Sequence, residues 1–523
     1  MAKITTRTLC EQVVQDITHH RPRGTLHIQK PITLRERKDT MENNIALPDC
    51  TKLFVGGHWK EPAVAAAYTN ENPALRKGLC EVAIAGEADV DQAVKAAHAG
   101  LASKEWAGMA AADRGRLLWK VGQIIRERAK ELATLESLDT GKLYVEALYG
   151  DMENAAGAFE YYAGWSNKIT GQVLPVPPKF LGYTRREAVG VVGAIIPWNF
   201  PLMMAAMKIA PALAMGNAVI LKPAEQTPLT AVALAGILDE VGLPKGILSV
   251  LTGFGDTGKA IVAHPGIDKI TFTGSTAVGK AIMRGCADTL KRVSLELGGK
   301  SPNIVFEDAD IKRAVRGVTT GIYYNQGQMC TAGSRVLVHE SIHDKFMDAF
   351  LASVKEIETG SPFDKASRMG SLVSKEQFER VSGYVELGQK EGATLALGGT
   401  PGGSEGYFFR PTVFTDVQPH HRIAQEEIFG PVVATSTFKT EEEVLAVANN
   451  VTYGLAAGMW TNDLARAHRV AHALKAGTVW VNTYNAMWRE SPFGGFKQSG
   501  HGREGGQHGA ELYTEVKNIC ISI

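Results

Sequence analysis

Cys330 lies in Asn325–Ala332, a segment of small and polar residues. A thiol presented on a loop or at a helix start can act as a nucleophile, because backbone amides there can face a developing oxyanion. A helix N-terminus at this point would also lower the pKa of the thiol. Since a buried cysteine is more often an inert thiol, this segment alone favours a structural role.

Glu296 ends an apolar run and is followed by Gly298 and Gly299. This is an unusual place for a surface charge. The carboxylate could instead be partly buried with a raised pKa, which suits a general base. The alternative is an ion pair with Lys300 at the end of a strand, and these residues alone leave both interpretations open.

Three more polar segments follow predicted strands. Asn199, beside two prolines, offers an amide donor for an oxyanion hole or is an ordinary turn residue. Lys222 and Glu225 could hydrogen-bond ribose hydroxyls at a strand end, where open α/β sheets bind ligands, or form a solvated pair. Residues 272–279 combine a strand, a glycine turn and a helix start, whose amides attract phosphate. Their GxxxxG spacing matches neither the dinucleotide fingerprint nor the P-loop, so a plain turn is the alternative.

The apolar pattern predicts an α/β fold that positions these segments. From about residue 188, short apolar strands alternate with helices, which is typical of βαβ units around a buried parallel sheet. The strands of the first series are expected at Val189–Ile196, Ala218–Leu221, Ile247–Leu251, Lys269–Phe272 and Val293–Leu297. A second series is expected to include Pro302–Phe306, Arg335–Val338 and Val479–Asn482. Two α/β lobes follow from the two series.

Different patterns precede the first sheet. Two amphipathic helices are expected, with Asp89 and Asp113 as their caps. Tyr161–Arg186 contains several prolines, which exclude a central strand and predict an exposed hairpin or arm.

Composition excludes several classes of protein. The chain has 523 residues, enough for roughly three domains. Its 56 Lys and Arg balance 55 Asp and Glu, so it lacks the charge of a nucleic-acid binder. The six cysteines form no CxxC pair, which favours a reducing compartment over a disulfide framework. With neither a membrane-length apolar run nor a secretory core, we expect a cytoplasmic protein whose residues 1–40 form a flexible extension.

Seven segments, in order and in wording, resemble the NAD(P)-dependent aldehyde dehydrogenases. They are PWNFP at 197–201, KPAEQTP at 222–228, FTGSTAVG at 272–279, ELGGKSP at 296–302, GQMC at 327–330, EEIFGPV at 426–432 and SPFGGFKQSGHGRE at 491–504. The resemblance extends from about Leu53 to the C-terminus. It implies two open parallel α/β lobes, a Rossmann-type cofactor domain and a catalytic domain, with a small β oligomerisation arm.

The resemblance also implies domain boundaries and residue roles. The extension would be 1–40, the cofactor domain 41–167 and 189–297, the catalytic domain 298–506, and the arm 168–188 and 507–523. Cys330 would be the nucleophile, Glu296 the general base, and Asn199 with the Cys330 amide the oxyanion hole. The residues expected to bind NAD, with NADP possible, are Ile195, Trp198, Lys222, Glu225, Gly255, Phe272, Gly274, Ser275, Gly279, Leu297, Glu427 and Phe429. An apolar, methionine-rich substrate funnel would contain Phe200, Met204, Met207, Met487, Trp488 and Phe493.

The implied reaction is the oxidation of an aldehyde to its acid through a cysteine thiohemiacetal and thioester. We expect an uncharged aliphatic or aromatic substrate, a homodimer or homotetramer, and no metal, nucleic acid or membrane partner. The alternatives are a betaine-aldehyde-type or semialdehyde substrate, a CoA-acylating enzyme, a non-catalytic scaffold, and a Cys–His hydrolase. The histidines nearest in sequence, such as His339 and His343, lie in a polar stretch that is expected to face solvent, which argues against the hydrolase. Glu296 argues against CoA as the acyl acceptor, because a thiol acceptor needs no hydrolytic base.

Overall fold

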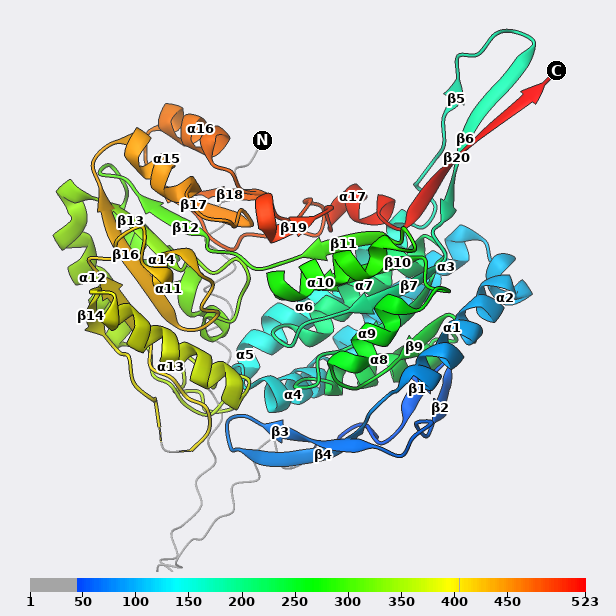
Figure 1. Ribbon diagram of the computed structural model, residues 1–523, viewed down its shortest axis with the longest axis horizontal. Helices are drawn as coiled ribbons and strands as arrows, with labels where there is room; N and C mark the ends of the chain where they lie inside the picture. Colours follow the sequence, from blue (N-terminus) through cyan, green and yellow to red (C-terminus); the bar gives the residue numbers. More distant parts are fainter. Residues whose placement is uncertain (1–44, 404) are drawn as a thin grey trace, which may run out of the picture. The chain divides into compact units, whose positions relative to one another are not determined.

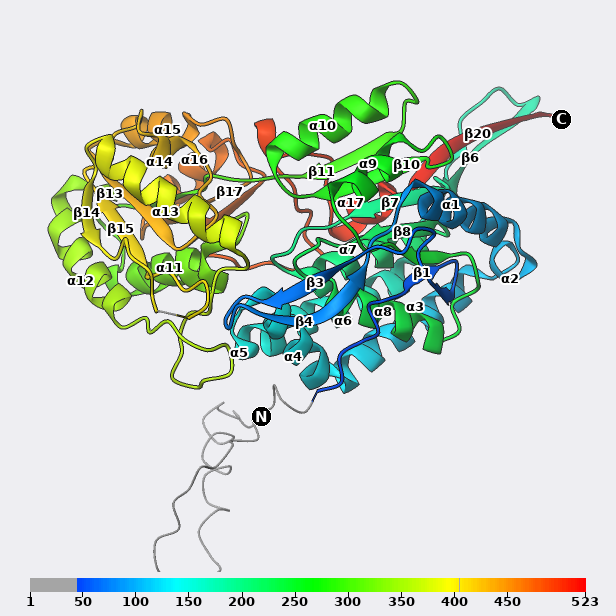
Figure 2. The same ribbon diagram turned by 60° about the horizontal axis from the view of Figure 1, so that its bottom comes forward.

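The computed structural model describes residues 45–403 and 405–523, and the predicted extension at 1–40 lies outside them. Two large β-sheets with their helices form the described chain (Figure 1). We call them the first and second lobes, in chain order of their central strands. Figure 2 shows the same separation: one lobe runs from yellow-green to orange, and the other is mostly blue to green, with the red C-terminal segment beside it. The predicted α/β class with two lobes is confirmed.

The first sheet is parallel at its centre. Its spatial order is β19 (Gly500–His501), β11 (Arg292–Glu296), β10 (Lys269–Thr273), β7 (Val191–Ile195), β8 (Ala218–Lys222), β9 (Leu248–Val250), β1 (Leu53–Val55) and β2 (His58–Lys60). The five predicted strands are β7 to β11, and they pair in parallel. Every residue of β7 and β8 is buried, which explains their apolar sequences. The antiparallel strands β1, β2 and β19 were not predicted.

The helices of the first lobe pack in two groups. One group contains α1 (Glu87–Ala102), α9 (Gly255–Ala263) and α10 (Thr276–Ala287). The other contains α3 (Ala111–Glu127), α4 (Ala129–Thr140), α6 (Met152–Trp165), α7 (Pro201–Ala214) and α8 (Leu229–Glu240). Short turns complete this lobe: α2 (Lys104–Ala107), α5 (Tyr144–Glu146) and the π-helical turn η2 (Ala147–Asp151), with the hairpin of β3 (Ala67–Asn72) and β4 (Lys77–Ala83). No helix among residues 45–403 and 405–523 is long and apolar enough to cross a membrane.

The two predicted helix caps are wrong. Helix α1 begins after Gly86, and Asp89 is its third residue. The Asp89 carboxylate accepts a hydrogen bond from the Gly86 N–H at 2.9 Å, so it supports the helix start from inside the first turn. Helix α3 begins after Ala110, with Asp113 again in the first turn. In both helices the aspartate is not the cap, but its negative charge is stabilised by the positive N-terminal end of the helix dipole.

The second sheet has the order β14 (Thr394–Leu397), β15 (Thr412–Thr415), β16 (Val432–Phe438), β13 (Arg335–His339), β12 (Pro302–Val305), β17 (Ala456–Trp460) and β18 (Thr478–Val481). All neighbours except β14 and β15 pair in parallel. Its larger helices are α11 (Ile311–Tyr323), α12 (His343–Lys355), α13 (Lys375–Lys390), α15 (Glu441–Asn449) and α16 (Leu464–Ala473). Its short turns are η3 (Tyr324–Gly327), η4 (Glu340–Ile342), α14 (Arg422–Gln425) and η5 (Lys497–Ser499).

The predicted proline-containing hairpin is present. It consists of β5 (Val173–Leu174) and β6 (Phe180–Ala188), with the prolines in the turn between them. The C-terminal strand β20 (Thr514–Ser522) lies beside β6 along its whole length (Figure 1). Helix α17 (Gly506–Glu511) precedes this strand and packs against α6 and α7. The strand part of the predicted C-terminal arm therefore begins at Thr514, after a helix.

Candidate active site

Cys330 lies in the turn between η3 and β13, not at a helix start. Asn325, Gln326 and Gly327, the last three residues of η3, have φ values of 48°, 57° and 70°. Burial and the carboxylates of Glu427 and Glu296 raise the pKa of the Cys330 thiol to about 12. The prediction that a helix N-terminus lowers this pKa is therefore wrong, because the thiol is buried and faces negative charge instead of the start of a helix.

The side chain of Asn199 lies against this turn. It is 4% exposed, and its Nδ2 donates to the carbonyl of Gln328 at 2.9 Å. In return, Nδ2 of Asn325 donates to the Asn199 carbonyl at 3.0 Å and to the Gln328 carbonyl at 3.3 Å. A side-chain amide has two N–H donors, so Asn199 keeps one for a further acceptor near the cysteine.

Glu296 ends β11 and is 4% exposed. Burial and the nearby Glu504 carboxylate raise the pKa of Glu296 well above its usual value. Its Oε2 has no hydrogen-bond partner within the described chain. The carboxylate packs against the backbone of Gly494, where an added Cβ would lie 2.7 Å from Oε1. A buried carboxylate with a raised pKa is the state expected of a general base.

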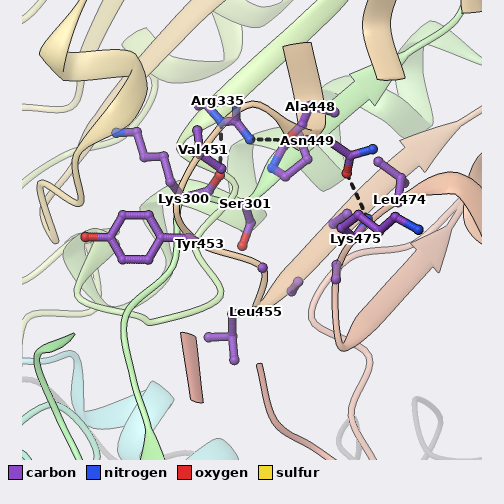
Figure 3. Close-up of a pocket in the computed structure, with 15 residues that line it drawn as sticks. Lys300, Ser301, Arg335, Ala448, Asn449, Val451, Tyr453, Leu455, Leu474 and Lys475 are labelled. Carbon is purple, nitrogen blue, oxygen red and sulfur yellow. Dashed lines mark hydrogen bonds between the residues drawn. The ribbon is translucent and has the colours of Figure 1, made fainter. Parts of the chain in front are cut away.

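Lys300 does not pair with Glu296, so the strand-end ion pair is wrong. Among the described residues, the buried Lys300 amine has no hydrogen-bond partner. It lines a small pocket with Ser301 and Tyr453, where Arg335 donates to the Lys300 carbonyl at 2.9 Å (Figure 3). Burial, with the nearby Arg335 charge, lowers the pKa of Lys300 to about 7.

A buried ion pair beside Glu296 was missed from the sequence. Lys208 of α7 and Glu504 lie 2.5 Å apart, and Thr271 Oγ1 also donates to Glu504 at 3.3 Å. Both charges act on the pKa of Glu296. The signal for one partner was present, because Lys208 interrupts an otherwise apolar helix and a buried lysine needs a counter-charge.

The predicted cofactor residues gather at the carboxyl ends of the first sheet. Ile195 pairs with Lys222 and with Phe272, and Thr273 pairs with Glu296. The segments that follow these strands therefore meet at one edge, where open α/β sheets bind ligands. Nζ of Lys222 lies 3.1 Å from Oε2 of Glu225, and burial lowers the pKa of Lys222.

Two helix starts at this edge suit a pyrophosphate. Ser275 caps α10 through its hydroxyl, and Gly279 allows close packing, because an added Cβ would lie 2.5 Å from Leu297. Gly255 begins α9, and a Cβ there would meet no described atom within 4 Å. Helix N-termini leave free N–H donors for phosphate oxygens. The open space at Gly255 and the Lys222–Glu225 pair therefore fit a dinucleotide.

Glu427 and Phe429 come from the second lobe and reach the first. Oε1 of Glu427 accepts from the Gly299 N–H at 2.9 Å, and burial raises the pKa of Glu427 to about 7. The Phe429 ring meets the Trp198 ring edge-on at 5.2 Å. Arg380 holds this loop by donating to the carbonyls of Glu427 and Ile428. These contacts hold the loop of Glu427 and Phe429 against the segments that carry Gly299 and Trp198.

The predicted funnel residues differ in exposure. Phe200 is 3% exposed, whereas Met204 and Met207 on α7 are partly buried against the core. Met487 and Trp488 follow β18 and are 42% and 66% exposed. Phe493, further along this loop, pairs with Glu504 through its backbone. The structure therefore brings Phe200 to the cysteine turn through Asn199 and leaves Met487 and Trp488 at the surface.

Comparisons with known proteins agree with this geometry. The sequence model of the Aldehyde dehydrogenase family matches residues 59–519. The chain is 48% identical to the putative aldehyde dehydrogenase DhaS of Bacillus subtilis, over 90% of this chain and 96% of that protein. It is 47% identical to human retinal dehydrogenase 2, over 90% of this chain and 92% of that protein. An aldehyde dehydrogenase of Bacillus cereus, solved as its NAD+ complex, superposes with a TM-score of 0.89 at 49% identity, covering 90% of this chain and 96% of that one. The chain therefore belongs to the aldehyde dehydrogenase family.

Proposed function

We propose that this aldehyde dehydrogenase uses NAD to oxidise an uncharged aldehyde to the carboxylic acid, through a thioester on Cys330. The observation that carries the proposal is the convergence of three groups around the cysteine turn. They are the Cys330 thiol, the Asn199 amide that is hydrogen-bonded to the cysteine turn, and the buried Glu296 carboxylate that acts on the thiol's pKa. A nucleophile, an oxyanion donor and a base are what acyl chemistry at an aldehyde carbon needs.

The first step is attack of the Cys330 sulfur on the aldehyde carbon. Because the pKa of the thiol is raised to about 12, its proton must leave as the bond forms, and Glu296 is the proposed acceptor. The Asn199 amide and the Cys330 backbone N–H stabilise the oxyanion. When bound, NAD supplies a nicotinamide ring that takes hydride from this adduct, so that a thioester remains on Cys330. Glu296 must then release the proton taken from Cys330 to solvent, and its regenerated carboxylate activates the water that hydrolyses the thioester.

The cofactor roles predicted above belong to this proposal. Lys222 and Glu225 would hold the adenosine ribose, the starts of α9 and α10 the pyrophosphate, and Glu427 with Phe429 the nicotinamide half. The domain boundaries predicted above remain part of the proposal. The reaction is tested by mixing the purified enzyme with NAD and an aldehyde in the absence of CoA. Steady formation of NADH and acid supports hydrolytic oxidation, whereas a strict requirement for CoA would establish the acylating alternative.

We expect NAD to be preferred over NADP by about tenfold. In its proposed role Glu225 accepts hydrogen bonds from the ribose hydroxyls, and a 2′-phosphate would meet its negative charge. Two like charges about 4 Å apart repel by ~1–4 kcal/mol near a protein surface, and Lys222, 3.1 Å from Glu225, offsets part of this. The measurement is the ratio of kcat/KM for the two cofactors. Glu225→Gln should narrow the ratio, and equal efficiencies in the wild type would contradict the assignment.

We expect betaine aldehyde to be a poorer substrate than 3,3-dimethylbutanal, its uncharged carbon analogue. A trimethylammonium cage relies on several aromatic faces, each worth up to ~2 kcal/mol when desolvated. Here the Phe200 ring already has the Lys142 ammonium 4.1 Å from its centroid, and Trp488 is 66% exposed. A methionine wall at Met204 and Met207 favours an apolar body instead. A higher kcat/KM for the cationic aldehyde would overturn this prediction.

We also propose that the sheet of β5, β6 and β20 serves as the oligomerisation arm of a homodimer or homotetramer. Its exposed apolar side chains include Leu181, Val516 and Ile521, and β20 has a free backbone edge among the described strands. Unpaired edges and exposed apolar residues favour pairing with another chain. Light scattering after size exclusion gives the assembly mass, and a monomer at micromolar concentration would contradict the proposal.

A further inference from the structure

A buried cluster of charged side chains lies beside the segment that carries Asn199. It consists of Glu136 on α4, Lys142 in the turn that follows, and Asp151 at the end of η2. Their side chains are 0%, 1% and 2% exposed. The Lys142 ammonium pairs with Asp151 and lies 3.7 Å from Glu136. Burying charged side chains is costly. The contacts that the cluster makes therefore indicate which parts of the structure it supports.

Two members of the cluster contact the residues that follow Asn199. Nζ of Lys142 lies 4.1 Å from the centroid of the Phe200 ring, a cation–π contact without solvent. Oε2 of Glu136 accepts from the Leu202 N–H at 3.1 Å and from Thr230 Oγ1 at 3.2 Å. The cluster therefore holds the start of α7 in two ways: Lys142 contacts the Phe200 ring, and Glu136 binds the Leu202 backbone N–H.

The Phe200 ring also joins this cluster to the cysteine turn. It stacks on Tyr324 at 6.3 Å with an interplanar angle of 16°. Tyr324 is followed by Asn325 and Gln326, two non-glycine residues with left-handed φ values. Such a conformation is unfavourable for L-residues and persists only where surrounding contacts hold it. Asn325 in turn donates to the Asn199 carbonyl, which closes a ring of contacts around the oxyanion donor.

We infer that Lys142 is a positioning residue for the oxyanion hole. Its ammonium, held by Asp151 and Glu136, fixes the Phe200 ring, and the ring sets the place of the Asn199 amide against Cys330. This inference rests on the role proposed above for Asn199. Because a misplacement of about 1 Å in an active site can cost ~100-fold in rate, a contact made one residue away from the donor is enough to matter.

The test replaces Lys142 by methionine and measures hydrolysis of 4-nitrophenyl acetate without NAD. This activated ester needs the thiol, the oxyanion hole and the base, but no cofactor. Lys142→Met should lower kcat for the ester at least tenfold, and aldehyde oxidation by a similar factor, with the Kd for NAD unchanged. In an Asn199→Ala background the same substitution should change the ester rate less than threefold. Equal losses in both backgrounds would show a general structural role and overturn the inference.

A matched control removes another cation from an aromatic face. Arg466 lies 4.6 Å from the Phe306 centroid in the second lobe and also pairs with carboxylates. Arg466→Met should lower Tm without changing the ester rate. Should Lys142→Met not fold, Phe200→Leu leaves the charges in place and removes the ring, and its ester rate should also fall at least tenfold. A wild-type rate in either variant overturns the positioning role, whereas a wild type that oxidises no aldehyde overturns the proposed function itself.

Discussion

Replacing Cys330 by alanine is expected to abolish aldehyde oxidation while NAD binding stays near the wild-type level. The thiol is the proposed nucleophile, and it lies close enough to Glu427 and Glu296 for their carboxylates to raise its pKa. Loss of a nucleophile that works together with its neighbours removes nearly all covalent catalysis, on the order of 10⁶-fold in kcat. The measurement is NADH formation with excess aldehyde, together with the Kd for NAD by fluorescence titration.

Cys286 provides the matched control. It is a buried cysteine on α10, 2% exposed and away from the cysteine turn. Cys286→Ala should retain wild-type turnover, although the smaller side chain can lower Tm. Substantial turnover in Cys330→Ala would show that the thiol is not the nucleophile, and the mechanism proposed above would fall.

Glu296→Gln is expected to slow thioester hydrolysis about 10²–10⁴-fold, the usual contribution of a general base. Glutamine keeps the size of the side chain but cannot take a proton from water. Acylation should suffer less, so a pre-steady-state burst of NADH should appear, followed by a slow steady rate. Stopped-flow absorbance measures both phases, and mass spectrometry of the quenched enzyme detects the acyl group on Cys330.

The pH dependence gives a second signature of Glu296. Because burial raises the pKa of this carboxylate, it is protonated at acid pH and becomes a base only as the pH rises through that raised pKa. Deacylation by the wild type should therefore increase with pH over this interval, and the increase should be absent in Glu296→Gln. If the variant instead fails at hydride transfer and accumulates no thioester, Glu296 has another role.

Much of this architecture is predictable because it depends on local pattern. Strands such as β8 are buried along their whole length, so their apolar residues identify them in the sequence. β19 has only two residues, and neither is apolar, so nothing local marks it as a strand. Its pairing with Glu296 depends on the way the chain returns from the second lobe.

The chemistry of the site is less predictable, because it depends on contacts between residues that are far apart in the sequence. The pKa of Cys330 is raised by burial and by Glu427 and Glu296, two carboxylates that come from opposite directions in the chain. Lys208 and Glu504 are separated by 296 residues, so no local spacing reveals their pairing. Sequence motifs predict which side chains are reactive. The charge state of each depends on the groups that the fold packs against it.

The position of β19 has a consequence for the synthesis of the protein. Until Gly500 and His501 have left the ribosome, β11 is the outermost strand of the first sheet, with Glu296 at its end. The hairpin strand β6 likewise waits for β20. A nascent chain that lacks this last stretch exposes two unpaired strand edges, which are templates for pairing with other chains. Truncation before Gly500 therefore exposes the cell to aggregation as well as to loss of the enzyme.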